Sequence, residues 1–63
     1  MKTVKFTYWQ DEGFYIGFLN EYPDYLTQAM DKEELAENLR SLFIDIGSGK
    51  IPYIRKVEEL LVD

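Results

Sequence analysis

Two segments near the start of the chain alternate between apolar and polar side chains. Residues 2–10 and residues 14–20 both have period two and are rich in aromatic and β-branched residues, a pattern typical of β-strands. Turn-forming residues separate the two segments, so we predict that they pair as an antiparallel hairpin. The apolar sides consist of Val4, Phe6 and Tyr8 in the first segment and of Phe14, Ile16 and Phe18 in the second.

The turn of this hairpin falls at residues 11–13. A loop that paired Tyr8 with Tyr15 would set the apolar side of one strand against the mixed side of the other. A three-residue loop instead pairs Tyr8 with Ile16 and brings the apolar sides together. Such loops commonly end in a residue with positive φ, a conformation that Gly13 adopts without steric penalty. We therefore expect the three-residue loop.

A helix is predicted from Asp31 to Gly47, after a short and weakly alternating third strand over Tyr25–Met30. Asp31 is a favourable N-cap residue, and Glu34 three positions later completes a pair that resembles a capping box. Gly47 is expected to end the helix in the left-handed conformation. The apolar stripe of this helix consists of Leu35, Leu39, Leu42, Phe43 and Ile46, which repeat with the helical period.

The last segment, Tyr53–Val62, admits two readings. Its apolar residues could mark a helical turn, but its short length and the sheet edge left open by the earlier strands favour a fourth strand. The fold class expected is therefore α+β in the order β-β-β-α-β, with a small antiparallel sheet and one helix packed on one face. Residues 1–63 are expected to form a single domain.

Composition limits the functions that such a domain can carry. The chain contains no cysteine and no histidine, so it can form neither a disulfide nor a Cys/His metal site, and we expect no cofactor. Its net charge of −5 disfavours direct nucleic-acid binding and suits a basic protein partner. A core this small is marginal alone, so a homodimer or larger homo-oligomer is expected. No apolar signal region and no membrane span are evident, which predicts a cytoplasmic protein.

Catalysis is not expected. The catalytic triads that need His are excluded, and the acidic residues near the turn and at the helix start are explained by turn formation and capping. A metal-dependent nuclease remains only a remote alternative. A binding surface is the better hypothesis. Its candidate residues are Lys5, Trp9, Tyr15 and Leu19 on the sheet face away from the helix, and Glu33, Glu37 and Ile44 on the outer helix stripe. The competing interpretations are that the last segment covers Trp9 and Tyr15, and that the helix stripe is merely solvated.

Five stretches resemble the HicB-like antitoxin family in their order and spacing. They are Trp9–Gly17, Pro23–Gln28, Glu33–Leu35, Glu37–Leu39 and Ile51–Val57, and together they span nearly the whole chain. The resemblance implies a partial RNase H-like fold and an antitoxin role in a bacterial toxin–antitoxin system. It also implies a small basic RNA-cleaving toxin of the HicA type as the partner.

Two differences from the family pattern stand out. Ala29 occupies a position where the family usually has Gly, which makes a bulge or a positive φ there more costly. Longer family members append a DNA-binding domain, and we expect none after Asp63. The function expected is therefore toxin neutralisation by covering the toxin, and the alternative is a self-assembling domain without a toxin partner.

Overall fold

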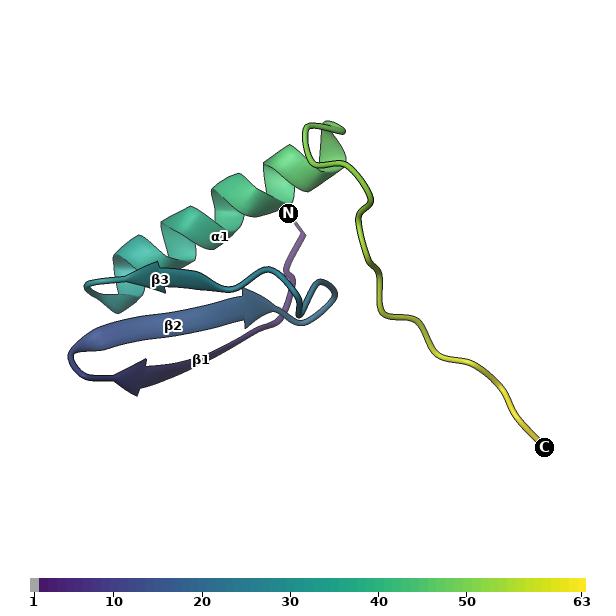
Figure 1. The fold of residues 1–63 in the computed structure, drawn as a ribbon, viewed down its shortest axis with the longest axis horizontal. Helices are drawn as coiled ribbons and strands as arrows, with labels where there is room; N and C mark the ends of the chain where they lie inside the picture. The colour runs from purple at the N-terminus through teal and green to yellow at the C-terminus, as the bar shows by residue number, and fades with distance from the viewer. Residues whose placement is uncertain (1) are drawn as a thin grey trace.

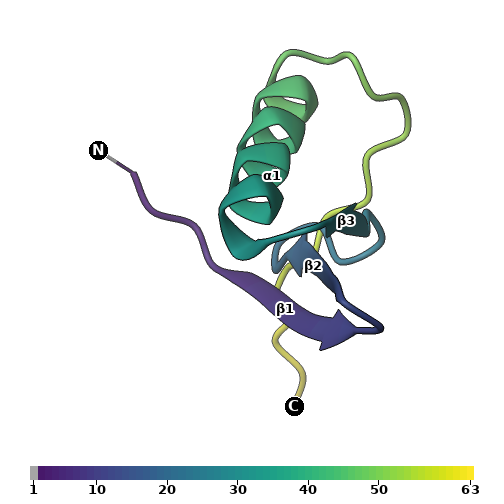
Figure 2. The same cartoon turned by 90° about the vertical axis from the view of Figure 1, so that its left-hand side faces the viewer.

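A computed structural model describes residues 2–63, which form three strands and one helix (Figure 1). The sheet is antiparallel with the order β1-β2-β3. The helix lies across one face of the sheet and packs on β2 and β3 (Figure 2). This arrangement confirms the predicted α+β class with a single helix on a small antiparallel sheet. The elements are β1 Phe6–Asp11, β2 Phe14–Leu19, β3 Thr27–Ala29 and α1 Lys32–Gly47.

The turn between β1 and β2 contains two residues, so the three-residue loop predicted from the sequence is wrong. Asp11 pairs with Phe14, and Glu12 and Gly13 between them have φ values of 50° and 85°. A type I′ turn requires positive φ at both central residues, and its twist matches that of the flanking strands. The positive φ expected at Gly13 is confirmed. The shorter loop pairs Tyr8 with Gly17, one residue away from the expected register.

This shift exchanges the two faces of β2 relative to β1, because side chains alternate along a strand. Gly17 lies on the helix side, where a Cβ built on it would be 3.1 Å from the Leu35 side chain. Opposed residues share a face, so Tyr8 and Thr27 also lie on the helix side. The buried core consists of Leu19, Ala29, Leu35 and Leu39.

The ends of α1 follow recognisable capping motifs. The Asp31 side chain accepts a hydrogen bond of 2.8 Å from the Glu34 amide, which confirms the predicted N-cap. The Glu34 carboxylate reaches back to accept one from the Met30 amide, at 3.0 Å. At the other end, Gly47 is the last helical residue as predicted, but the left-handed residue is Gly49, with φ of 79°.

The C-terminal end of α1 is a Schellman motif. The Gly49 amide donates to the Ile46 carbonyl and the Lys50 amide to the Asp45 carbonyl, which places Gly49 at the position that favours positive φ. Gly47 therefore ends the helix without adopting the left-handed conformation expected for it.

The predicted fourth strand over Tyr53–Val62 does not form; neither does a helix. Residues 51–63, here called the C-terminal tail, bend at residues 51–53 and then leave the body of the molecule beyond the end of the sheet (Figure 1). The tail contacts the β2–β3 connection, where Arg55 pairs with Asp24 at 3.0 Å and the Val57 amide donates to the Glu21 carbonyl at 3.3 Å. Charged residues come in adjacent pairs along the tail, so it lacks the alternation that would bury one side of a strand.

The third strand is shorter than predicted, because only Thr27–Ala29 pair with β2. Ala29 is 4% exposed and packs in the core. The structure shows no bulge or positive φ at Ala29, because this residue pairs regularly with Tyr15.

Candidate functional site

The sheet face opposite α1 carries a cluster of large apolar side chains. The register places Trp9 opposite Ile16, and Thr7 opposite Phe18. The helix packs on the other side and the tail leaves beyond the sheet end, so neither covers this cluster (Figure 1, Figure 2). We call this side of the sheet the open sheet face; its residues are Thr7, Trp9, Asp11, Phe14, Ile16, Phe18 and Gln28.

Aromatic rings dominate the centre of the open sheet face. Trp9 and Phe14 are 41% and 37% exposed, while Ile16 and Phe18 are half-buried between their neighbours. The Trp9 and Phe18 rings meet edge to face, with centroids 6.2 Å apart, a favourable geometry for aromatic pairs. Exposed aromatic clusters of this kind are typical of protein-binding sites, in which Trp is a frequent anchor.

The structure separates the residues that the sequence grouped on this face. Trp9 lies there as predicted, but Tyr15 and Leu19 lie on the helix side, so their assignment to the uncovered face is wrong. Leu19 is 4% exposed and belongs to the core. Tyr15 stacks with Tyr8, with ring centroids 6.3 Å apart. Lys5 is exposed just before β1, where its carbonyl oxygen accepts a hydrogen bond from the Asn20 amide.

The three predicted interface residues of the helix are exposed, but they lie across the molecule from Trp9. Glu33, Glu37 and Ile44 all belong to α1, which covers the opposite side of the sheet (Figure 2). Ile44 is the apolar member of the stripe and is 67% exposed. A partner that covers the open sheet face would therefore not reach these residues by the same surface.

A second concave surface lies between the N-terminal segment and α1, and we call it the N-terminal groove. It has a volume of about 440 Å³, within the range of small ligand sites. Val4, Phe6 and Phe43 give it an apolar lining, and Lys2 and Arg40 supply two cations. The Lys2 ammonium lies 5.3 Å from the centre of the Phe43 ring, a cation–π contact.

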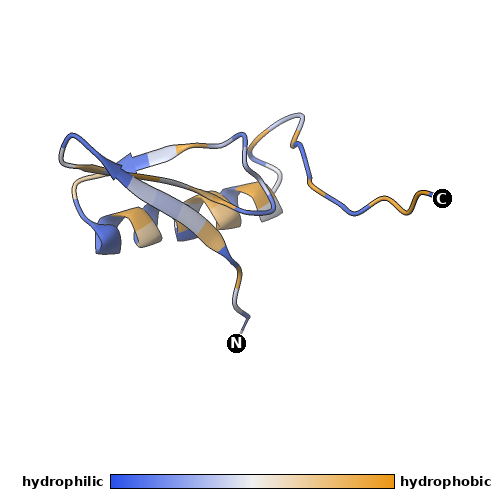
Figure 3. Ribbon diagram, turned by 90° about the horizontal axis from the view of Figure 1, so that it is seen from below, coloured by the Kyte–Doolittle hydropathy of each residue, from blue (hydrophilic) through white to orange (hydrophobic). Residues whose placement is uncertain are grey.

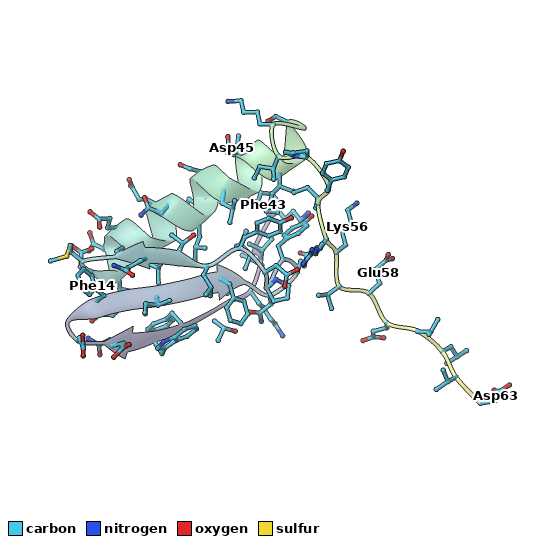
Figure 4. All side chains as sticks on the ribbon, in the orientation of Figure 1. Phe14, Phe43, Asp45, Lys56, Glu58 and Asp63 are labelled. Carbon is cyan, nitrogen blue, oxygen red and sulfur yellow. The ribbon has the colours of Figure 1, made fainter. Side chains whose placement is uncertain are left out.

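Sequence reasoning missed this groove, because Phe43 was assigned to the buried stripe of the helix. The available signal was the spacing of Lys2, Val4 and Phe6, which share one side of the chain. This segment begins before β1, and its side chains line the groove beside α1. Figure 4 shows Phe43 on the side of α1 that faces the sheet.

The part of the chain that the structure describes has neither a metal-binding cluster nor a membrane-spanning helix. Within residues 2–63, no three acidic side chains gather in a way that could hold a metal ion. The same part of the chain contains no helix long and apolar enough to span a bilayer.

Comparison with known proteins adds no relative. No protein-family model, no curated protein sequence and no solved structure matches the chain. The resemblance to HicB-like antitoxins therefore stays a prediction.

Proposed function

We propose that this domain is an antitoxin-type protein-binding module that neutralises a small, basic, RNA-cleaving toxin of the HicA type by covering it. The observation that carries the proposal is the open sheet face, where Trp9 and Phe14 remain exposed beside Ile16 and Phe18. Desolvating aromatic anchors in a partner's pocket is the usual source of binding energy in protein interfaces. The module acts in the bacterial cytoplasm and itself performs no catalysis.

Charge supports a basic partner. The chain carries 12 acidic and 7 basic residues, so its field accelerates encounter with a positively charged protein. Asp11 and Glu12 lie at the turn end of the open sheet face, where they can face cations at the rim of the contact. The antiparallel sheet with one helix is compatible with the partial RNase H-like fold implied by the family resemblance, and we include that fold in the proposal.

Co-expression with a small basic protein encoded in the adjacent reading frame tests the proposal. We expect the domain to relieve the growth arrest caused by that protein and to co-purify with it in a complex that weakens as salt is raised. Trp9→Glu places a charge at the centre of the open sheet face and should abolish both effects while the fold, followed by circular dichroism, is retained.

Tyr53→Glu is the matched control, because it introduces the same charge at an exposed aromatic position outside both the open sheet face and the N-terminal groove. This variant should protect cells as well as the wild-type domain. Rescue that survives Trp9→Glu, or an absence of any complex with the neighbouring protein, would refute the proposal.

Self-assembly without a toxin is the second candidate, and the same exposed cluster favours it. Two copies could pair through their open sheet faces, because a two-fold axis brings the same patch of both copies together and would set the two Trp9 clusters against each other. Sedimentation would then show a dimer that Trp9→Glu dissociates, with no toxin bound to either form.

A further inference from the structure

The outer part of the C-terminal tail is apolar and exposed. In residues 57–63, here called the distal tail, Leu60, Leu61 and Val62 are 85%, 95% and 77% exposed. Figure 3 shows this apolar stretch at the far end of the chain, outside the body of the molecule. A contiguous run of large apolar side chains in water is unfavourable, so burial of this run against another surface would be strongly favoured.

The distal tail is also acidic. It contains Glu58, Glu59 and Asp63 and no basic residue. Figure 4 shows Glu58 and Asp63 along the part of the tail that points away from the sheet and helix. A surface that accepts the distal tail must therefore combine apolar area with positive charge.

The N-terminal groove has this combination. Its apolar walls include Val4, Leu39 and Phe43, its cations are Lys2 and Arg40, and none of its lining residues within 2–63 is acidic. The open sheet face lacks such a pair of cations among its residues. Charge complementarity thus distinguishes the groove from the sheet face as the site for the distal tail.

We infer that the N-terminal groove of one copy of this protein binds the distal tail of a second copy. Leu60 and Leu61 enter the apolar part of the groove, and the carboxylates of the tail face Lys2 and Arg40. The Val57 amide donates a hydrogen bond to the Glu21 carbonyl in the β2–β3 connection. From there the tail runs away from the N-terminal segment and from α1 (Figure 1). The tail is thus presented outward, toward another molecule.

Each copy has one groove and one distal tail, so the contact can be exchanged reciprocally. A reciprocal exchange, in which each copy binds the tail of the other, closes into a symmetric dimer. A head-to-tail contact, in which each copy binds the tail of the next, produces a longer open assembly. Either assembly uses a surface separate from the open sheet face and leaves Trp9 available. Failure of the proposed toxin binding would therefore leave the tail exchange unaffected, and failure of the tail exchange would leave toxin binding unaffected.

Sedimentation velocity over a range of concentrations tests the exchange with full-length chains. Wild-type protein should sediment at twice the single-chain mass or more, and high salt should weaken the assembly. Leu61→Asp changes a side chain that is 95% exposed, so it should leave the fold intact but shift the midpoint of assembly to at least ten-fold higher concentration. Ile44 also lines the N-terminal groove, so Ile44→Asp should weaken the assembly in the same way from the groove side. Arg40→Glu is a second groove variant.

Mixing distinguishes tail exchange from symmetric pairing of faces. The Leu61→Asp chain keeps its groove and the Ile44→Asp chain keeps its tail, so the mixture should form a one-to-one complex at concentrations where each variant alone is monomeric. A synthetic peptide of residues 57–63 should bind the Leu61→Asp chain in calorimetry, and Arg40→Glu in that background should weaken it at least ten-fold.

Two results would overturn the inference. One is a wild-type chain that remains monomeric at every concentration tested. The other is an assembly that Leu61→Asp leaves intact and Trp9→Glu dissociates, which would place the contact on the open sheet face instead.

Discussion

The Leu35 side chain of α1 packs closely on Gly17 of the sheet, which makes Gly17→Ala a sharp test of the packing. A Cβ at this position would lie 2.6 Å from the Thr7 carbonyl oxygen and 3.1 Å from both the Leu35 Cδ2 and the Tyr8 Cβ. The nearest of these atoms belongs to the backbone of β1, so no side-chain rotation can relieve the clash. The strands have to separate locally, or α1 has to move away from them.

Forcing an extra carbon into a packed interior costs about 1–3 kcal/mol. A chain of 63 residues is stabilised by roughly 3–9 kcal/mol, at about 0.05–0.15 kcal/mol per residue. A loss of about 2 kcal/mol would lower the folding equilibrium constant roughly 30-fold and the melting temperature by about 8–16 °C. We therefore expect a large and readily measured destabilisation from the addition of one methyl group.

The assay is urea denaturation followed by far-ultraviolet circular dichroism, at one fixed protein concentration because assembly would add its own stability. Gly47→Ala is the matched control, since a Cβ there meets nothing within 4 Å. Gly47 is helical, so alanine should leave the stability unchanged or raise it by up to about 1 kcal/mol. A Gly17→Ala chain that unfolds at the same urea concentration as the wild type would refute the close packing of β1 and α1 around Gly17.

Three smaller perturbations test the caps, the turn and the tail by thermal denaturation. Asp31→Ala removes the acceptor of the 2.8 Å N-cap hydrogen bond and should cost about 1 kcal/mol, whereas Asp31→Asn should retain most of the stability. Glu12→Asn should raise stability by about 0.5–1 kcal/mol, because Asn tolerates the φ of 50° found there better than Glu does; an unchanged or lower stability would contradict the type I′ turn. Arg55→Ala breaks an exposed pair with Asp24 and should cost less than about 1 kcal/mol; a larger loss would show that the tail is part of the core structure.

Local signals in the sequence were sufficient to predict the helix and the presence of the hairpin. The boundaries of α1 follow from Asp31, whose side chain can satisfy an orphan amide, and from the glycines beyond the apolar stripe. Both signals act over a few residues, so they need no knowledge of distant contacts. The same is true of Gly13, whose positive φ is set by the turn itself.

The register of the hairpin could not be obtained in this way, and it decides which residues are available to a partner. The central strand β2 is apolar on both sides, with Ile16 and Phe18 on one and Tyr15 and Leu19 on the other. Hydrophobic alternation therefore favoured the wrong register. Gly17 fits the observed register, because a Cβ on it would crowd both the Leu35 side chain of α1 and the backbone of β1.

The fate of the tail was also beyond local reasoning. A fourth strand was predicted because the sheet has open edges, but an open edge is only an opportunity for pairing. The tail instead contacts the β2–β3 connection, where Arg55 pairs with Asp24 and the Val57 amide donates to the Glu21 carbonyl. The partners in both contacts lie far apart in the sequence. Contacts of this kind depend on where the helix ends in space.

Trp9 is the single tryptophan of the chain, and its position gives the protein an intrinsic optical reporter. The ring is 41% exposed and sits against Phe18 outside the buried core. Its emission should shift to the blue, and resist quenching by acrylamide, when a bound ligand excludes water from that part of the surface. A ligand that occupies the opposite side of the molecule should leave the emission unchanged, so a single unlabelled cuvette measurement can tell the two docking sites apart.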